Sequence, residues 1–294
     1  MNNNNVLSNF QYGFRPNSSS VDAVSQLVAD VILGFEKNQF TVAILLDISK
    51  AFDTIEHKIL LKTLSFYGIC EKVYNWLETY LSNRSQYVDY YNNSSSISKI
   101  DQGVPQGSIL GPLLFSLYTN DLPYCVSNSN IIQFADDTPV YISGTNIQTM
   151  CQLMNSNLKA LFDWFSCNKL SLNTNKTTAI CFKKQSQTLP HSSFKLHING
   201  CIIQVKSTVT LLGLHLDELL RWDIHASYLS KHISKILYML NRLKNILPST
   251  TLKMIYNGLI HSKLSYGIIL WGSSYKCIQN DLFKLQKKSF ENDI

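Results

Sequence analysis

The chain has 294 residues, of which 45% are hydrophobic and 16% charged, a balance typical of a globular protein with one large domain or a few packed subdomains. The seven scattered cysteines lack the spacing of zinc ligands, and no apolar run approaches the roughly 20 residues of a membrane span, so we expect a soluble, intracellular protein without structural zinc or disulfides. The formal charge of +6 is local, because residues 226–294 hold ten Lys and Arg against three Asp and Glu. Such a cationic segment suits a phosphodiester partner, although a solvated helix face is its common alternative.

The first half of the chain predicts helices around one buried strand. Apolar residues at helical spacing predict a helix over residues 21–35, with Ser20 as its N-cap. Residues 41–46 form a short apolar, partly β-branched run that predicts a buried strand ending at Asp47. A helix over about 56–66 follows. A loop with three glycines and two prolines, residues 103–112, then precedes a helix over about 112–119.

The second half predicts a hairpin followed by alternating elements. Two β-type runs, residues 131–134 and 140–142, flank Asp136 and Asp137. We expect Pro139 to distort this hairpin, because proline cannot donate to a sheet. The rest of the chain predicts a helix over 148–165 and then strands over 178–182, 194–198 and 202–206. A long amphipathic helix is predicted over 226–247.

Three carboxylates carry the clearest chemical signal. Asp47 ends an apolar strand, and Asp136 and Asp137 lie at the tip of the predicted hairpin, where a turn lets neighbouring side chains converge. Carboxylates at one point suit a pair of hard cations that activate a 3′-hydroxyl and hold the leaving pyrophosphate. Taken separately, an Asp pair is an ordinary turn feature and Asp47 could be the N-cap of the next helix.

Long blocks of sequence make the combination specific. Three segments resemble, in order, the catalytic blocks of non-LTR retrotransposon reverse transcriptases of the jockey type. They are residues 46–57 (LDISKAFDTIEH), 103–112 (GVPQGSILGP) and 134–138 (FADDT). The order continues through residues 168–173 (NKLSLN), 211–213 (LLG) and 271–273 (WGS). This resemblance implies an α+β, right-hand polymerase architecture with an antiparallel palm sheet backed by helices and a mainly helical thumb. It implies a remnant of the fingers at 1–40, a palm at 41–217 with a fingers insertion at about 56–100, and a thumb at 218–294.

The resemblance also assigns roles to residues. It implies that Asp47, Asp136 and Asp137 hold two Mg²⁺ ions, with Mn²⁺ as an alternative, and that the Ile48 carbonyl contributes. Phe52 would exclude a 2′-hydroxyl, unless it is only a core aromatic, and Gln106 and Gly107 would contact the incoming nucleotide. Lys176 would assist the leaving pyrophosphate or is simply a surface lysine. Nucleic acid would be bound by a turn and by one face of the last long helix, through Leu212, Gly213, Lys231, Lys235 and Arg242.

The function implied is RNA-directed DNA polymerase, with an RNA template, a DNA primer and dNTPs as partners and, by analogy with the family, a nuclear site of action. An RNA-dependent RNA polymerase is disfavoured by Phe52. The resemblance begins only at residues 11–16 (QYGFRP), so the fingers strands that hold the triphosphate are expected to be missing. A truncated, catalytically inactive nucleic-acid-binding remnant therefore remains the alternative.

Overall fold

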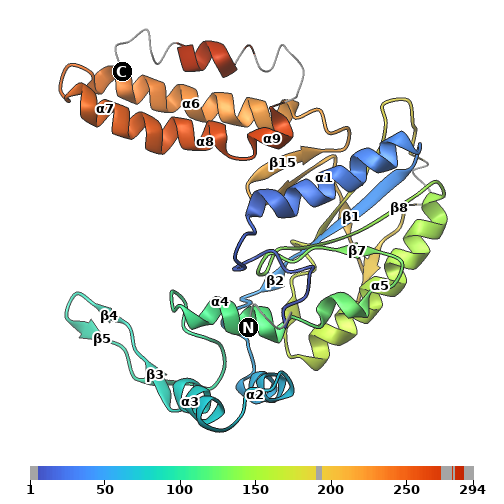
Figure 1. Ribbon diagram of the computed structural model, residues 1–294, viewed down its shortest axis with the longest axis vertical. Coiled ribbons are helices and arrows are strands. Elements are labelled where there is room, and N and C mark those ends of the chain that lie inside the picture. The colour runs from blue at the N-terminus through green and yellow to red at the C-terminus, as the bar shows by residue number, and fades with distance from the viewer. Residues whose placement is uncertain (1–5, 190–193, 273–279, 281, 288–294) are drawn as a thin grey trace.

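A five-stranded sheet lies between two helices at the centre of the molecule (Figure 1). The computed structural model describes residues 6–189, 194–272, 280 and 282–287. Helix α1 (Ser20–Glu36) covers one face of the sheet, and helix α5 (Ile147–Cys167) covers the other. The strand order is β13-β10-β1-β8-β7, with β1 (Phe40–Leu46), β7 (Asn130–Ile131), β8 (Thr138–Gly144), β10 (Thr178–Phe182) and β13 (Gln204–Val205).

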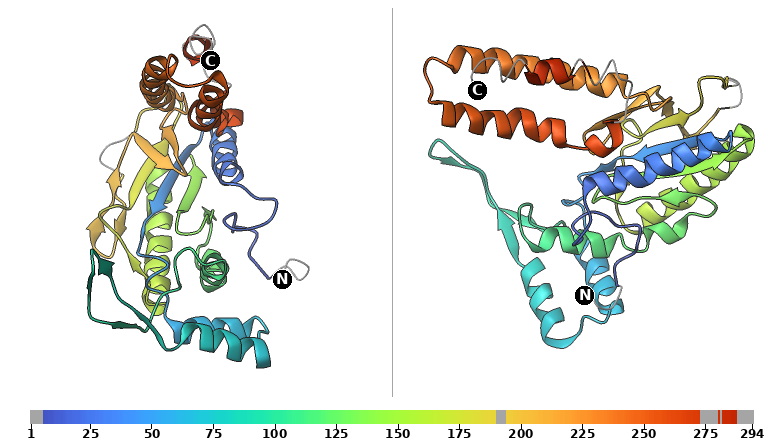
Figure 2. Two further views of the ribbon diagram at one scale, coloured as in Figure 1. Left: turned by 90° about the vertical axis from the view of Figure 1, so that its left-hand side faces the viewer. Right: turned by 45° about the horizontal axis from the view of Figure 1, so that its top comes forward.

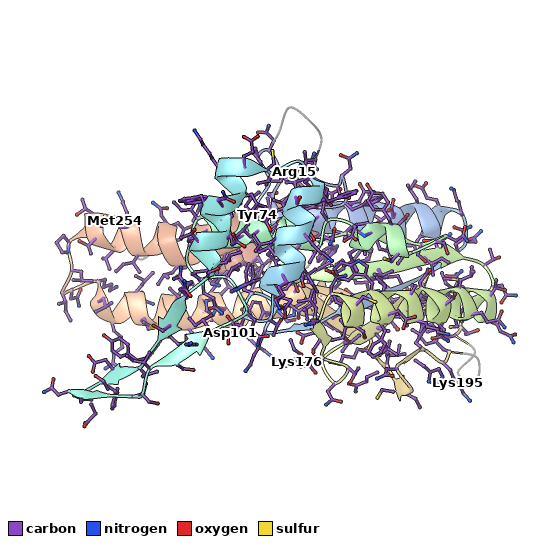
Figure 3. All side chains as sticks on the ribbon, turned by 90° about the horizontal axis from the view of Figure 1, so that it is seen from below. Arg15, Tyr74, Asp101, Lys176, Lys195 and Met254 are labelled. Carbon is purple, nitrogen blue, oxygen red and sulfur yellow. The ribbon has the colours of Figure 1, made fainter. Side chains whose placement is uncertain are left out.

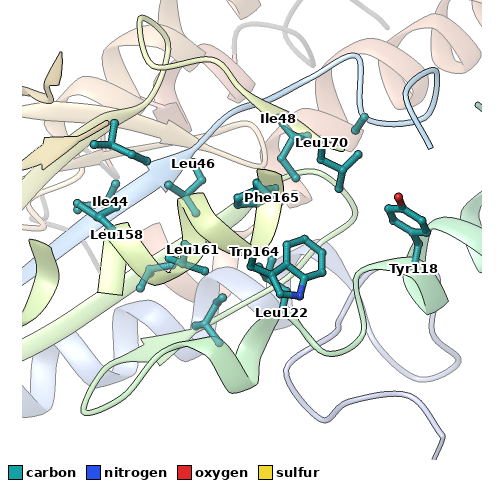
Figure 4. Close-up of a cluster of buried hydrophobic side chains, with 14 of the residues drawn as sticks. Ile44, Leu46, Ile48, Tyr118, Leu122, Leu158, Leu161, Trp164, Phe165 and Leu170 are labelled. Atoms are coloured by element: carbon teal, nitrogen blue, oxygen red, sulfur yellow. The ribbon is translucent and has the colours of Figure 1, made fainter. Parts of the chain in front are cut away.

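Alternation along β1 divides the hydrophobic interior into two cores. Val42, Ile44 and Leu46 pack toward α5, where Figure 4 shows Ile44 and Leu46 beside side chains of that helix. Ala43 points the other way, into the core formed with α1 and the C-terminal helices. Successive side chains of a strand face opposite sides, so the apolar run predicted from the sequence is buried on both. The predicted strand and its burial are confirmed.

The sheet is antiparallel apart from its edge. Strand β13 pairs with β10 in parallel, through Thr178 with Gln204 and Ala179 with Val205. The strand expected at 202–206 is instead divided: β12 (Cys201–Ile202) pairs with β11 (His197–Ile198), while β13 joins the main sheet. The expectation of one continuous strand was wrong because neighbouring residues here pair with two different partners.

Helix α1 begins with a capping box one residue earlier than expected. Ser19, not Ser20, is the N-cap, and its side chain accepts a hydrogen bond from the Asp22 backbone N–H. The Asp22 carboxylate accepts in turn from the Ser19 backbone N–H, so two otherwise free donors of the first turn are satisfied. This cap fixes where the chain turns from the N-terminal segment into the helix.

The elements between β1 and β8 form a helical group with a projecting hairpin (Figures 1 and 2). Helix α2 (His57–Phe66) packs against both α3 (Glu71–Leu81) and α4 (Leu110–Tyr118). The 3₁₀ turn η2 (Leu122–Cys125) follows α4. Between α3 and α4 the chain forms a long hairpin whose strands are β3 (Arg84–Gln86), β4 (Asp89–Tyr90), β5 (Asn93–Ser94) and β6 (Ser98–Ile100).

The C-terminal part is mainly helical and follows the hairpin β14 (Thr208–Leu211) and β15 (Leu214–Asp217). Its long helix α6 (Asp223–Leu243) packs against α7 (Ser249–Tyr256), the π-helical segment η3 (Asn257–His261), α8 (Ser262–Ser265) and α9 (Ile268–Trp271). Helix α6 begins before the predicted residue 226, directly after a turn in which the Asp217 carboxylate accepts from the backbone N–H groups of Leu219, Arg221 and Trp222. Among the described residues, no helix is both long and apolar enough to span a bilayer.

Candidate active site

Strands β1 and β8 bring Asp47 opposite Asp137. Their antiparallel register pairs Ala43 with Tyr141 and Leu46 with Thr138. One further step along both strands sets Asp47 across from Asp137. Residues directly opposite in an antiparallel pair lie about 4.5–5.5 Å apart at Cα and share one face of the sheet. The two carboxylates therefore leave the sheet at the same end and on the same side.

The third carboxylate lies in the tight turn that starts β8. Phe134 and Asp137 exchange two backbone hydrogen bonds of 2.9 and 3.1 Å, which leaves Ala135 and Asp136 as a two-residue loop. Ala135 has φ of 54°, whereas Asp136 is not in the positive region, a pattern typical of a type II′ turn. Because alanine rarely adopts positive φ, this conformation costs about 1 kcal/mol or more. The turn thus places Asp136 outside the ladder, where its charge acts on the neighbouring Asp137.

Pro139 does not distort this hairpin. The pairs Phe134 with Asp137 and Ile131 with Val140 belong to one unbroken register. Between them the Ile132 N–H donates to the Pro139 carbonyl at 3.0 Å. Since N–H and C=O of a residue point the same way in an antiparallel strand, the missing proline N–H also faces Ile132, at the end of β7. Only the one ladder bond that a residue 139 N–H would donate to Ile132 is lost, and the edge toward β1 stays intact.

Mutual repulsion marks the three carboxylates as a group. Burial, then the charges of Asp136 and Asp47, raise the pKa of Asp137 to about 6. The two ion pairs in the described part of the chain join Lys169 to Glu56 and Lys183 to Glu218, so no Lys or Arg there neutralises the group. Among the described residues, no group of three or more His, Cys, Asp or Glu side chains is arranged as a metal site. Carboxylate oxygens without a basic partner are nevertheless the donors that a divalent cation prefers, and such a cation would relieve the repulsion among them.

A loop far along the chain holds the backbone of Asp47. The pairing of β2 (Ile48–Ser49) with β9 (Ser171–Leu172) brings it there. The Asp47 N–H donates to Thr177 Oγ1 at 3.3 Å, and the Asp47 carbonyl accepts from the Asn173 N–H at 2.8 Å. Lys176 is an exposed residue of the same loop. Lys176 thus lies on the loop that contacts the Asp47 backbone, and Thr177 and Asn173 are positioning residues that the sequence did not indicate.

Phe52 is half-buried on the loop after Asp47. Its ring packs against that of Phe115, with centroids 4.8 Å apart, and its carbonyl accepts from the Val104 N–H at 2.8 Å. The glycine loop is thereby held directly beside it. Gly103 needs its positive φ of 84° and the absence of a side chain, because a Cβ would lie 2.7 Å from the Asp53 carbonyl oxygen. His57 adds a further contact, with Nε2 2.7 Å from the Gly103 carbonyl oxygen.

The three glycines of this loop have different surroundings. A Cβ on Gly111 would lie 3.0 Å from Ser108 Oγ, whereas one on Gly107 would meet nothing within 4 Å. The close approach allowed by Gly103 and Gly111 is therefore to the chain itself, and only Gly107 leaves open space for a ligand. Gln106 is exposed, and its amide donates to the Asp53 carboxylate at 2.8 Å. Asp53 thus orients the side chain expected to contact a nucleotide.

The N-terminal segment packs against the Asp136–Asp137 turn. The Tyr12 N–H donates to the Gln133 carbonyl at 2.8 Å, and Gln11 forms a bridge with Gln133. A Cβ on Gly13 would lie 2.6 Å from the Ala135 backbone nitrogen, so only glycine allows this contact. Gly13 is a site residue that sequence analysis did not single out, although it lies in the residue 11–16 block.

The residues expected to bind nucleic acid lie apart from the carboxylates, in the C-terminal part. Leu212 and Gly213 form the β14–β15 turn with φ of 47° and 81°, as a two-residue type I′ turn requires. The three basic residues expected on helix α6 are all exposed: Lys231, Lys235 and Arg242. A buried histidine of α6, His225, has its pKa lowered by burial to about 4, so it is neutral and adds no charge to this surface.

Comparison with known proteins assigns the arrangement to a family. A sequence model described as reverse transcriptase (RNA-dependent DNA polymerase) matches residues 1–216. The probable RNA-directed DNA polymerase from transposon BS of Drosophila melanogaster is 27% identical over 97% of this chain and 32% of its own length. The RNA-directed DNA polymerase from mobile element jockey of the same species is 26% identical over 97% of this chain and 32% of its own length. The chain thus spans about a third of these relatives.

A solved structure agrees with this assignment at the level of the fold. The apo telomerase from Candida tropicalis matches 96% of this chain and 46% of its own chain, with a TM-score of 0.50 and 11% sequence identity. The α+β polymerase architecture expected from the resemblance is confirmed.

Proposed function

Because this chain belongs to the reverse transcriptase (RNA-dependent DNA polymerase) family, we propose that it carries the polymerase centre of a non-LTR retrotransposon and copies an RNA template into DNA. The observation that carries the proposal is the register of β1 and β8, which sets Asp47 opposite Asp137. Two segments that match separate catalytic blocks of the family thereby form one acidic site. A DNA primer and dNTPs complete the substrates.

Asp47, Asp136 and Asp137 would hold two Mg²⁺ ions, with Mn²⁺ as an alternative and the Ile48 carbonyl as a further donor. When bound, such a pair lowers the pKa of the primer 3′-hydroxyl and neutralises the leaving pyrophosphate. The chain's own contribution is position: the β1–β8 ladder and the Thr177 and Asn173 contacts fix Asp47, and the two-residue turn fixes Asp136. Preorganised carboxylates avoid a reorganisation cost at the moment of reaction.

Four residues near this centre would select and orient the nucleotide. Phe52, backed by Phe115, would lie under the sugar and exclude a 2′-hydroxyl. Gln106, oriented by Asp53, and the open backbone at Gly107 would contact the nucleotide and its templating base. Lys176, exposed on the loop beside Asp47, would stabilise charge on the pyrophosphate.

The C-terminal part would hold the primer and template. The Leu212–Gly213 turn would contact the primer end, and Lys231, Lys235 and Arg242 would bind duplex backbone without reading sequence. We assign residues 1–40 to a remnant of the fingers, 41–217 to the palm with a fingers insertion at about 56–100, and 218–294 to the helical thumb. By analogy with the family, we place its site of action in the nucleus.

Primer extension tests the proposal. The 294-residue chain is given a DNA primer on an RNA template with Mg²⁺ and dNTPs, and extended products are resolved by length. Asp136→Asn is expected to lower the rate at least about a hundredfold, while Asp163→Asn, on the exposed side of α5, should leave it unchanged. Absence of extension by the unaltered chain, together with salt-sensitive binding of the hybrid, would support the inactive nucleic-acid-binding remnant instead.

A further inference from the structure

The hairpin of residues 84–100, called here the fingers hairpin, projects from the body of the molecule with its side chains in the open (Figures 1 and 3). Tyr87, Tyr90 and Tyr91 are 61%, 70% and 84% exposed. The Tyr90 and Tyr91 rings contact each other edge to face, with centroids 4.7 Å apart. Exposed aromatic rings on an extended hairpin have no folding role that accounts for them.

A pocket of about 760 Å³ opens at the base of the fingers hairpin. Its walls come from both hairpin strands, from the loop after Asp47 and from the glycine loop at residues 103–106. Three cations line it, Lys50, Arg84 and Lys99, against the two acids Asp53 and Asp101. The cations exceed the acids by one charge, so the pocket favours an anion.

The pocket and the candidate active site share a wall. Lys50 and Asp53 flank Phe52, and the Phe52 carbonyl accepts from Val104, which also lines the pocket. Arg84 is held in place at the base of the hairpin, with its guanidinium 5.4 Å from the centre of the Tyr80 ring. A ligand in the pocket therefore lies next to the nucleotide site and continues outward along the hairpin.

We propose that the fingers hairpin and its basal pocket bind the unpaired template strand ahead of the active site. The inference rests on the proposed function. Phosphates fit the cationic pocket, and successive bases stack on Tyr87, Tyr90 and Tyr91, the combination by which proteins hold single strands without sequence preference. Duplex is a poor fit because its bases are already stacked on one another. A protein partner is disfavoured because Asp89 and the polar run 92–96 interrupt the exposed rings and the exposed Val88 and Ile97, so the hairpin has no long apolar run.

The experiment compares two primer–template duplexes that differ only in the unpaired template, of about two and about twelve nucleotides. The hairpin from Arg84 to its tip is about 20 Å long, so only the longer overhang reaches the tyrosines. Affinities of the 294-residue chain are measured by fluorescence anisotropy without dNTPs. Tyr90→Ala with Tyr91→Ala is expected to weaken binding of the long overhang at least about tenfold and to leave the short one unchanged. Tyr124→Ala, at a tyrosine 74% exposed outside the hairpin, is the matched control and should change neither.

A charge variant tests the pocket separately. Lys99→Gln is expected to lower the slope of log Kd against log salt by about 0.7 for the long overhang. Two results would overturn the inference: an equal loss of affinity for both overhangs, or no loss of affinity in the hairpin variants. The second result is also the one expected if the hairpin docks a protein. Overhang-dependent binding by a chain that does not extend primers would contradict only the polymerase proposal. Extension without overhang dependence would contradict only this one.

Discussion

The hydroxyl of Tyr266 donates to the carbonyl oxygen of Leu212, and so joins the last helices to the β14–β15 turn. Ser20 Oγ lies 3.0 Å from the same hydroxyl. One phenol thereby ties together the start of α1, the turn and the C-terminal helices. The Trp271 indole N–H, which donates to the Tyr266 carbonyl at 2.9 Å, holds the backbone of the tyrosine in place.

Tyr266→Phe should loosen the Leu212–Gly213 turn without changing the carboxylates. Loss of the hydroxyl leaves a partly buried carbonyl unsatisfied and is expected to lower the free energy of unfolding by about 1 kcal/mol. If the turn holds the primer end, KM for primer–template should rise several-fold while kcat for a bound primer changes little. Tyr238→Phe, at a tyrosine 63% exposed on α6, is the control. Equal kcat and KM values in the two variants would show that Tyr266 has only a structural role.

Asp137→Asn should change how stability depends on pH. The pKa of Asp137 is about 6 in the folded chain against 3.8 for an ordinary aspartate, so the folded state binds more protons between these values. Its contribution to stability is therefore present below pH 3.8 and is lost as pH rises through 6. Because the side chain still meets water, the difference between the two chains should be about 1 kcal/mol or less. The free energy of unfolding of both chains is measured with urea from pH 4 to 7.5. A difference between the two chains that does not change with pH would contradict the repulsion argument.

Divalent cations should stabilise the unaltered chain at neutral pH. Repulsion among Asp47, Asp136 and Asp137 is relieved by a bound cation, which acts only on the folded state. Titration with Mg²⁺ is expected to raise the thermal midpoint by a few degrees at saturation and to raise it less in Asp137→Asn. Monovalent salt at matched ionic strength shows how much of the rise is due to screening. Ca²⁺ is tested as a second divalent cation. A similar response in both chains would exclude a site at these carboxylates.

Phe52→Val should reduce discrimination between deoxyribonucleotides and ribonucleotides. A smaller side chain leaves room for a 2′-hydroxyl, so the ratio of kcat/KM for dNTP over NTP is expected to fall at least about tenfold. Loss of the contact with Phe115 will also destabilise the fold, by about 1–3 kcal/mol. Phe115→Leu is the control, since it disturbs the same contact but leaves the Phe52 ring. An unchanged ratio in Phe52→Val would discard the steric gate.

Gly13→Ala should displace the Asp136–Asp137 turn. Its Cβ would lie 2.6 Å from the Ala135 backbone nitrogen, where neither main chain can yield without moving the loop. Overpacking of this kind costs about 1–3 kcal/mol, and primer extension should fall with it. Gly258→Ala, where a Cβ meets nothing within 4 Å, is expected to be neutral or slightly stabilising. Equal activity and stability in the two variants would mean that the N-terminal segment does not support the turn.

Local patterns in the sequence were sufficient for much of the fold. The apolar run before Asp47, the helical spacing of α1, α5 and α6, and the order of the family blocks predicted the main elements and the α+β architecture. Errors arose where neighbouring residues have different partners, as when residues 201–205 divide between two sheets. The effect of Pro139 could not be judged from sequence either, because it depends on which neighbour its missing N–H faces.

What the sequence by itself determined is which acids are candidates: Asp47 at a strand end and Asp136–Asp137 in a turn. Only the tertiary structure decided that they lie together, through the pairing of Leu46 with Thr138. It also decided that Gly103 serves the chain's own packing, that Thr177 fixes Asp47 and that the fingers hairpin stands free. The physical reason is the same in each case. Strand register and loop packing are set by contacts between residues distant in the chain, and local propensity carries no information about such partners.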